Sequence, residues 1–229
     1  MNFKFVEKPS KHIIIDNFFS TQLANECLEE FIKLEPYYQD AQTSGMATFE
    51  DNCEICSKEN DFQVKFIRDN SMLSLNDLYK KTPYNSIIMK SIHEQLKIGS
   101  PLDSFCKNIS GFFSLISQVN SSETQLSRYG KCEFYGIHKD NSIEIPQTRI
   151  LTLVYYVNKE PAKFEGGDLI IYNEKLDENL RIKPKHNRAI LFESKTKHAV
   201  DTVKLNGDFA DGRFSVNCWL GFENLLRFR

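Results

Sequence analysis

The sequence predicts a mainly β protein with N-terminal helices (α+β), in which a jelly-roll core, or double-stranded β-helix, is packed by helices on one face. Segments with helical periodicity come before about residue 122, and short runs of β-branched, aromatic and aliphatic residues come after it. One run, RILTLVYYV at 149–157, is apolar on both alternating faces, so both faces should be covered. We therefore expect a single domain over 1–229, with helical support and loops in 1–122 and the jelly-roll core in 123–222.

Three helices are expected in the N-terminal half. They lie between Ser20 and Pro36, within residues 84–97, and from Pro101 to about Asn108. Ser20 is a suitable N-cap for the first helix, whose apolar residues follow a helical period, and Pro36 should end it. Residues 40–70 are polar and irregular, so we expect a long loop there, with one or two short strands.

The C-terminal half has the composition of a sheet. The expected strands are TQLSRY, CEFYGI, RILTLVYYV, DLIIYN, RAILFE, AVDTVK and RFSVNCWLGF. Gly166-Gly167 lies between two strand-like segments and should form a turn or a bulge. The number and spacing of these strands fit a double-sheet jelly roll.

The composition is that of an ordinary globular protein, and it argues against two classes of partner. The 229 residues carry a formal net charge of -2, and Lys and Arg form no cluster, so nucleic acid is not expected to bind. No apolar segment reaches the length of about 18 residues that a membrane span needs, and the N-terminal apolar run is too short for a signal peptide. We expect a cytoplasmic protein without a membrane partner; its oligomeric state is not indicated.

The six cysteines are expected to be reduced thiols, because the chain is large and has no secretory signal. Cys53 and Cys56 have the spacing of half a zinc site or of a redox motif. No second such pair or nearby histidine pair completes a site, so we interpret them as loop or surface thiols.

The most informative residues for chemistry are His138 and Asp140 in FYGIHKDNS. They follow a strand-like run and are two positions apart, so in an extended chain both side chains point the same way and can converge on a metal. His198 follows the strand RAILFES and can join them if the sheet folds back on itself, as it does in a jelly roll. Two imidazoles and one carboxylate leave adjacent coordination positions open, which suits non-haem Fe(II) with an organic co-substrate and O2.

Arg213 is a lone cation at the start of the otherwise apolar strand RFSVNCW. Its planar guanidinium can pair with a carboxylate through two hydrogen bonds. A co-substrate with two carboxylates would need such an anchor inside the barrel.

Between Gln125 and Trp219 the sequence resembles the catalytic core of prolyl 4-hydroxylase-type enzymes in the Fe(II)/2-oxoglutarate-dependent oxygenase superfamily. The matching segments, in order, are QLSRYG, FYGIHKD, RILTLVYYVN, FEGGDLIIY, IKPKHNRAILFES, KHAV and GRFSVNCW. The N-terminal IIIDNFFSTQLANECLEEF also resembles that family's lead-in of a strand, a turn and a helix.

The resemblance implies that His138, Asp140 and His198 hold the iron and that Arg213 binds the distal carboxylate of 2-oxoglutarate. It also implies Fe(II), 2-oxoglutarate as co-substrate and O2, with ascorbate as an optional addition. Many members of the prolyl 4-hydroxylase branch have Lys where Arg213 stands, and LNGDFAD, between His198 and Arg213, is longer than expected.

Two further residues match positions that usually help to hold that carboxylate. They are Tyr129 in SRYG and Thr152 in RILTL. The resemblance therefore assigns both of them, together with Arg213, to co-substrate binding.

The activity implied is that of a dioxygenase that hydroxylates an unactivated C–H bond of a prolyl or other residue in a protein or peptide. An oxygenase of a free amino acid or small metabolite is one alternative, and a non-catalytic metal-binding jelly-roll module is another. The intact Asp140 and Arg213 argue against the module. The loops that would select the substrate, 40–80 and 158–166, match no known pattern.

Overall fold

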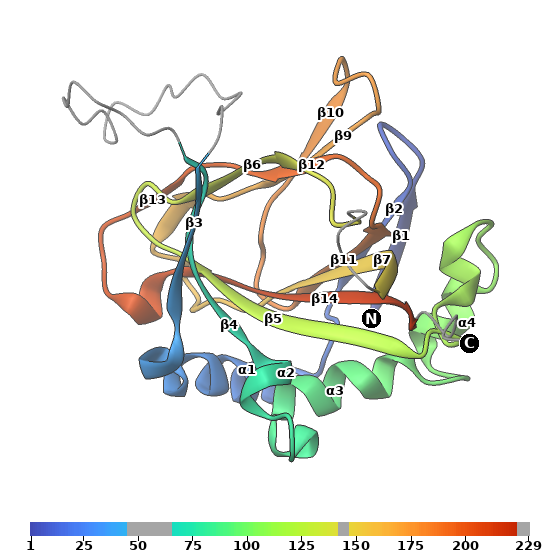
Figure 1. Cartoon of the computed structure of the whole chain (residues 1–229), viewed down its shortest axis with the longest axis horizontal. Helices are drawn as coiled ribbons and strands as arrows, with labels where there is room; N and C mark the ends of the chain where they lie inside the picture. The colour runs from blue at the N-terminus through green and yellow to red at the C-terminus, as the bar shows by residue number, and fades with distance from the viewer. Residues whose placement is uncertain (45–65, 142–146, 224–229) are drawn as a thin grey trace, which may run out of the picture.

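The computed structural model describes residues 1–44, 66–141 and 147–223 (Figure 1). Its body is a curled antiparallel sheet whose eight central strands form the two layers of a jelly roll. The strands are β5 (Ser121–Tyr129), β6 (Phe134–His138), β7 (Gln147–Tyr156), β9 (Leu169–Tyr172), β10 (Asn179–Ile182), β11 (Arg188–Glu193), β12 (His198–Val200) and β14 (Arg213–Glu223). One layer has the order β11-β7-β14-β5 and the other β6-β12-β9-β10.

Two short strands lie apart from these layers. They are β8 (Phe164–Gly166) and β13 (Val203–Leu205), which pair with each other. The predicted turn follows β8, where Gly166 and Gly167 have φ of +74° and +67°. A Cβ at Gly166 would lie 2.3 Å from the carbonyl oxygen of Thr202, so the predicted turn is confirmed and requires glycine there.

Four strands precede the core in the sequence. They are β1 (Asn2–Val6), β2 (His12–Asp16), β3 (Gln39–Ser44) and β4 (Phe66–Ser74). β1 and β2 extend the first layer beyond β11, whereas β4 pairs with both β5 and β6 and so joins the two layers. The sequence predicted the lead-in strand and the short strands within 40–70. It did not predict β1, a strand of five residues whose pairing partner is β2.

Four α-helices are described, together with four short 3₁₀ segments. The helices are α1 (Thr21–Lys33), α2 (Leu75–Leu78), α3 (Ile87–Leu96) and α4 (Pro101–Cys106), and the 3₁₀ segments are η1 (Glu35–Tyr37), η2 (Pro83–Asn85), η3 (Phe112–Leu115) and η4 (Phe209–Asp211). The Ser20 side chain caps α1, accepting a hydrogen bond from the amide of Leu23. The three predicted helices are confirmed as α1, α3 and α4.

The helices cover the outer face of the β5-containing layer, below β5 and β14 in Figure 1. Phe31 of α1 and Ile92 of α3 belong to the same buried cluster as Leu153 and Val216 of the sheet. On the opposite face of β7, Val154 and Tyr156 belong to a second buried cluster inside the jelly roll. The predicted burial of both faces of this strand is therefore confirmed.

One of the described cysteines differs from the prediction of reduced thiols. Cys27, Cys106 and Cys218 are buried free thiols, but Cys132 is disulfide-bonded, so the prediction that every cysteine is reduced is wrong. Spacing along the chain gives no information about which distant cysteines meet. Cys53 and Cys56 lie outside the described residues.

Among the residues that the structure describes, no helix combines the length and the apolar character that a membrane span requires.

Candidate metal and co-substrate site

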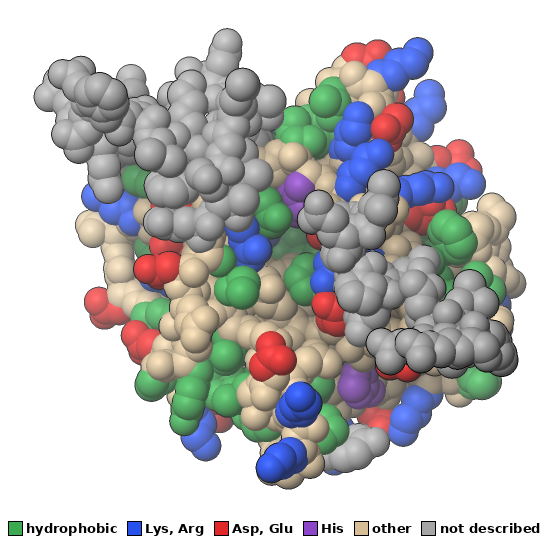
Figure 2. All heavy atoms as spheres, in the orientation of Figure 1, with side chains coloured by type: hydrophobic (Ala, Val, Ile, Leu, Met, Phe, Trp, Pro, Cys, Tyr) green, Lys and Arg blue, Asp and Glu red, His purple; other side chains and the backbone are tan. Residues whose placement is uncertain are grey.

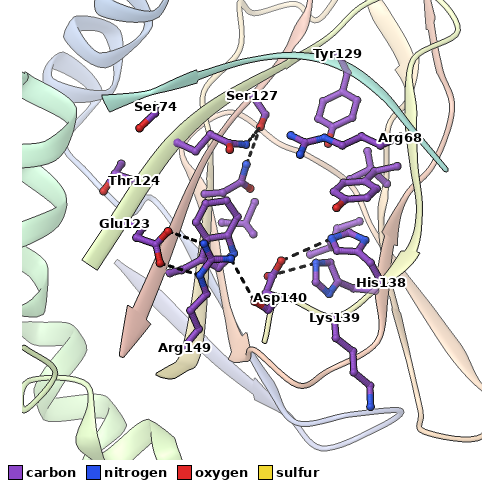
Figure 3. A pocket seen from close by; sticks show the side chains of 18 of the residues that line it. Arg68, Ser74, Glu123, Thr124, Ser127, Tyr129, His138, Lys139, Asp140 and Arg149 are labelled. Carbon is purple, nitrogen blue, oxygen red and sulfur yellow. Dashed lines mark hydrogen bonds and ion pairs between the residues drawn. The ribbon is translucent and has the colours of Figure 1, made fainter. Parts of the chain in front are cut away.

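A cavity of about 570 Å³ opens between the two layers of the jelly roll (Figure 3). The metal-ligand candidates lie on one side of it, and Arg213, Tyr129 and Trp219 line it from the helix-covered layer. The space-filling view shows this face hollowed near its centre, with basic side chains gathered along the β9–β10 hairpin beside the hollow (Figure 2).

The structure brings His138, Asp140 and His198 together. Within the described residues they are the one group of three or more His, Cys, Asp or Glu side chains able to share a metal ion, with ligand atoms all within 4.8 Å of one another. Nε2 of His138 lies 3.7 Å from Oδ1 of Asp140, and Nε2 of His198 lies 3.5 Å from Oδ2. The sheet causes this, because β12 pairs with β6 and places His198 directly opposite His138.

Both imidazoles are oriented by the same local device. Nδ1 of His138 lies 2.8 Å from the carbonyl oxygen of Gly136, and Nδ1 of His198 lies 2.9 Å from that of Thr196. A carbonyl oxygen only accepts, so each Nδ1 donates, and each ring directs its Nε2 toward the cluster. The Tyr135 ring stacks on His138, with centroids 3.6 Å apart.

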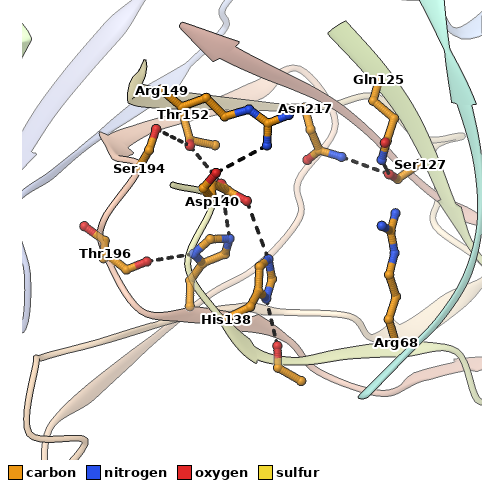
Figure 4. A network of polar contacts seen from close by, with 12 residues as sticks. Arg68, Gln125, Ser127, His138, Asp140, Arg149, Thr152, Ser194, Thr196 and Asn217 are labelled. Atoms are coloured by element: carbon orange, nitrogen blue, oxygen red, sulfur yellow. Dashed lines mark hydrogen bonds and ion pairs between the residues drawn. The ribbon is translucent and has the colours of Figure 1, made fainter. Parts of the chain in front are cut away.

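The carboxylate of Asp140 is held from the neighbouring layer (Figure 4). The hydroxyl of Thr152 donates to Oδ2 at 2.8 Å and lies 3.0 Å from the hydroxyl of Ser194. The backbone amide of Asp140 donates to the carbonyl of Ser194, and Nη1 of Arg149 donates to the carbonyl of Asp140. Asp140 follows β6 in an irregular segment, so these contacts fix its position.

The charge states of the cluster suit a cation. Burial, followed by the proximity of His198, lowers the pKa of His138 to about 3, so this ring is neutral at neutral pH. Burial raises the pKa of Asp140, but His198, His138 and the hydroxyl of Thr152 lower it more, and it lies below its ordinary value. A neutral nitrogen donor beside an ionised carboxylate is the form that binds a divalent metal.

At the other end of the cavity, Arg213 is buried, with 1% of its surface exposed. Nε donates to the carbonyl of Gly167 and Nη1 to the hydroxyl of Ser215. The rings of Tyr129 and Tyr156 flank the guanidinium, with their centroids 4.8 Å and 4.9 Å from Cζ. No ion pair joins Arg213 to an acid in the described part of the chain.

Two buried polar atoms at this end have no hydrogen-bond partner, Nη2 of Arg213 and the hydroxyl of Tyr156. An unpaired buried donor costs about 1–3 kcal/mol, so such pairs of donors are kept where a ligand supplies the acceptor. A carboxylate would accept from both. The residues present therefore fit an anionic co-substrate at this end and a divalent metal at the other.

The sheet register explains which residues face each end. Four alternate cross-strand pairs of β5 and β14 share one face of the sheet: Tyr129 and Arg213, Ser127 and Ser215, Gln125 and Asn217, and Glu123 and Trp219. On β7, Tyr156 lies opposite Ser215 and Thr152 opposite Trp219. Strands advance about 3.3 Å per residue, so Thr152 lies roughly 13 Å along β7 from Tyr156. The structure thus places Thr152 beside Asp140. The resemblance had assigned it to co-substrate binding, together with Arg213.

The sequence reasoning missed several residues of the site. Tyr156 and Ser215 contact Arg213, whereas Tyr135 and Arg149 contact the metal cluster. Tyr156 has the same strand parity as Thr152, so alternation along RILTLVYYV was the signal that could have found it. Ser215 lies two residues after Arg213 in β14, and Tyr135 lies three residues before His138 in β6, so both were within reach of local reasoning. Arg149 depends on the register between distant strands.

Comparison with known proteins agrees with this geometry. Residues 124–221 match a family model described as the 2OG-Fe(II) oxygenase superfamily. The chain is also 30% identical over 187 residues to an uncharacterized PKHD-type hydroxylase of Synechocystis sp., an alignment that covers 75% of this chain and 59% of that protein. This chain therefore spans about three-fifths of the length of that relative. The predicted resemblance is confirmed.

Two solved structures share the fold. A prolyl hydroxylase from Trichoplax adhaerens, in complex with a hypoxia inducible factor oxygen degradation domain peptide fragment, has a TM-score of 0.61 and 17% identity, covering 92% of this chain and 83% of that chain. A Pseudomonas putida prolyl-4-hydroxylase has a TM-score of 0.57 and 14% identity, covering 92% of both chains. At these identities the likeness shows the fold alone, and it confirms the predicted fold class.

Proposed function

Because its core, residues 124–221, matches the 2OG-Fe(II) oxygenase superfamily, we propose that this protein is an Fe(II)- and 2-oxoglutarate-dependent dioxygenase that hydroxylates an unactivated C–H bond. One observation carries the proposal. A single cavity has a two-histidine, one-carboxylate cluster at one end and buried, unpaired donors of Arg213 and Tyr156 at the other. A metal-chelating co-substrate with a second carboxylate needs both features at once.

His138, Asp140 and His198 would hold Fe(II). The two Nε2 atoms and the ionised carboxylate supply three ligands, which leaves further positions for co-substrate and O2. Tyr135 on one ring and Phe192, 4.8 Å from the ring of His198, restrict how the imidazoles can turn. This restraint keeps the open positions directed into the cavity.

Arg213 and Tyr156 would bind the distal carboxylate of 2-oxoglutarate, with Tyr129 packed against the guanidinium. Because the guanidinium is already fixed by Gly167 and Ser215, little side-chain freedom would be lost on binding. This preorganisation sets the orientation of the co-substrate, whose other end would point toward the metal cluster.

The bound iron would supply the oxidation, in which O2 and 2-oxoglutarate convert R–H to R–OH with release of succinate and CO2. The contribution of the chain is to bind, orient and exclude water. Thr152 and Ser194 hold the carboxylate of Asp140, and the buried clusters around Val154 and Val203 keep the walls of the cavity dry.

For the substrate, we propose a prolyl or other residue of a protein or peptide. Support comes from the hydroxylase name of the Synechocystis relative and from the peptide bound in the Trichoplax structure, both of which describe those proteins. In this chain, hydroxyl and amide side chains line the cavity outside the metal end, among them Ser74, Asn76 and Gln125. Such groups can hydrogen-bond to a peptide backbone.

The test measures succinate formed from 2-oxoglutarate by protein loaded anaerobically with Fe(II) and then exposed to O2. Wild type is compared with His138→Ala and Arg213→Ala, and the exposed Arg181→Ala serves as the control for loss of an arginine. We expect turnover to vanish in the first variant, to need far more 2-oxoglutarate in the second, and to be unchanged in the control.

A panel of prolyl peptides, other peptides and free amino acids then distinguishes the substrate classes. Stimulation by peptides alone supports the proposal, and stimulation by a free amino acid alone would assign a metabolite oxygenase. Metal binding without any consumption of 2-oxoglutarate would instead indicate a non-catalytic metal-binding module.

A further inference from the structure

Arg149 of β7 makes an unusually complete set of contacts at the mouth of the cavity (Figure 3). Nε and Nη2 donate to the two carboxylate oxygens of Glu123, at 2.9 Å and 2.6 Å. Nη1 donates to the backbone carbonyl of Asp140 at 3.3 Å, and Cζ lies 4.2 Å from the centre of the Trp219 ring. The guanidinium therefore ties together β5, β14 and the segment that follows β6.

The contact with Asp140 matters because this residue lies outside any regular element. Its amide donates to Ser194, and its side chain accepts from Thr152. Among the described residues, the hydrogen bond from Arg149 is the one recorded for its carbonyl oxygen. The same peptide unit is also held through the amide of Asn141, which donates to the carbonyl of Ser194 at 3.3 Å. The bond from Arg149 is therefore one of two that orient the peptide plane after the proposed metal ligand.

Trp219 is the second group near the proposed metal ligand that Arg149 contacts. It lies opposite both Glu123 and Thr152 in the sheet, and Thr152 donates to the carboxylate of Asp140. Its Nε1 is buried without a hydrogen-bond partner. The stacked guanidinium of Arg149 holds the indole ring in this position.

The charge of Arg149 is already matched by the bidentate pair with Glu123, and its side chain is only 14% exposed. Two of its three nitrogen atoms donate to that carboxylate and the third to the carbonyl of Asp140. The arrangement is suited to holding protein groups in place, and it leaves little free hydrogen-bonding capacity for an anionic ligand.

We propose that Arg149, held by Glu123, is a positioning residue that sets the metal affinity of the site by fixing Asp140 and the Trp219 ring. The inference rests on the proposed role of Asp140 as a metal ligand. It extends the site beyond the three ligands to a guanidinium that contacts the backbone of one of them. Contacts of this kind, made to a ligand from outside the coordination sphere, change metal affinity by about 10–100-fold.

Arg149→Lys is the informative substitution. Lysine keeps the positive charge near Glu123, but a single ammonium cannot reproduce the planar contacts to Glu123 and Asp140 while covering the Trp219 ring. Arg188→Lys is the matched control, because Arg188 makes a similar bidentate pair with Asp16, at 2.6 Å and 3.0 Å. Its side chain is 11% exposed, and among the described residues that pair makes no hydrogen bond or ion pair with the metal cluster.

The measurement is a titration of the metal-free full chain with Co(II), without co-substrate or substrate. Trp219 is the only tryptophan of the sequence, so its fluorescence reports binding at the site, and visible absorption of Co(II) reports the ligand geometry. Melting temperatures check folding. Glu123→Gln, which removes the charged partner of Arg149, provides a second variant should Arg149→Lys fail to fold.

We expect Arg149→Lys to bind Co(II) about tenfold more weakly than wild type, with altered absorption, while Arg188→Lys binds as wild type does. Equal affinity in wild type and Arg149→Lys would overturn the inference, as would equal weakening in Arg149→Lys and Arg188→Lys. If wild type itself binds no Co(II), the proposed function fails, and this inference fails with it.

Discussion

The two ends of the cavity are built in different ways. At the metal end, each imidazole is oriented by a carbonyl two residues earlier in the sequence, and one strand pairing brings the two histidines together. At the anchor end, Arg213 depends on the carbonyl of Gly167, 46 residues away, and on the rings of two tyrosines from other strands. The orientation of each imidazole is thus set locally in sequence, whereas most contacts of Arg213 come from other strands and from Gly167.

The ends also differ in their electrostatics. The metal end combines a neutral His138 with the ionised Asp140, whose carboxylate is hydrogen-bonded by Thr152. The anchor end buries a cation that has no acidic partner among the described residues and leaves two donors unpaired. The co-substrate should therefore relieve an unfavourable arrangement at the anchor end, whereas the metal completes an arrangement already formed at the other.

The largest effect is expected from a substitution that disrupts the metal end alone. Asp140→Ala removes one of three ligands, and we expect affinity for Co(II) to fall by roughly a hundredfold or more. Fluorescence titration with Trp219 as the reporter measures this. Asp201→Ala, a carboxylate outside the cluster, is the control. Wild-type affinity in Asp140→Ala would show that the three side chains are not the metal site.

The next largest effect is expected from a substitution that disrupts the anchor end alone. Arg213→Met keeps a long side chain but removes the charged donor, and we expect the KM for 2-oxoglutarate to rise about fiftyfold, since a hydrogen bond to a charged group contributes about 1.5–3 kcal/mol. Co(II) affinity should stay within about twofold of wild type because the ends share no ligand. A parallel loss of metal affinity would show that the two ends are coupled, contrary to the comparison above.

This contrast explains what the sequence could predict. His138 and Asp140 are two residues apart after a strand-like run, so their convergence could be predicted, although Asp140 lies beyond the end of β6 and is held by Thr152, Ser194 and Arg149. Arg213 was visible as a lone cation in an apolar strand. The jelly roll, three helices and the Ser20 cap followed from periodicity and from residues with strong local preferences.

The residues that sequence reasoning missed or misplaced share a different property. Thr152 faces Asp140, and Tyr156 faces Arg213, only because β7 and β14 pair in one register out of several that alternation permits. Arg149 becomes informative only when Glu123 and Trp219 are seen to lie opposite each other. β1 was missed because its short sequence is stabilised by pairing with β2. For Thr152, Tyr156 and Arg149 the cause is long-range register, which one sequence does not specify.

Thr152→Val tests whether Thr152 belongs to the metal end or to the anchor end. It removes the hydroxyl that donates to Asp140 at nearly constant volume, and we expect about tenfold weaker Co(II) binding. The KM for 2-oxoglutarate, measured at saturating metal, should change little. Thr124→Val is the matched control, because Thr124 is also buried and donates to the thiol of Cys218. A raised KM with unchanged metal affinity would instead return Thr152 to the anchor end.

The smallest expected effect tests whether the anchor end is arranged to bind a ligand even though this arrangement lowers the stability of the ligand-free protein. The hydroxyl of Tyr156 is buried and unpaired, so Tyr156→Phe should leave the melting temperature of the metal-free protein unchanged or raise it. The same change should raise the KM for 2-oxoglutarate about fivefold, the effect of losing one hydrogen bond worth about 1 kcal/mol.

The neighbouring Tyr155 provides the control, since it lies on the opposite face of the same strand and its hydroxyl contacts Asn187 at 3.5 Å. Tyr155→Phe should lower the melting temperature slightly and leave the KM unchanged. If Tyr156→Phe destabilises the free protein as much as Tyr155→Phe does, its hydroxyl is already satisfied there. The anchor end would then be ordinary packing around Arg213, and the difference between the two ends would reduce to sequence distance alone.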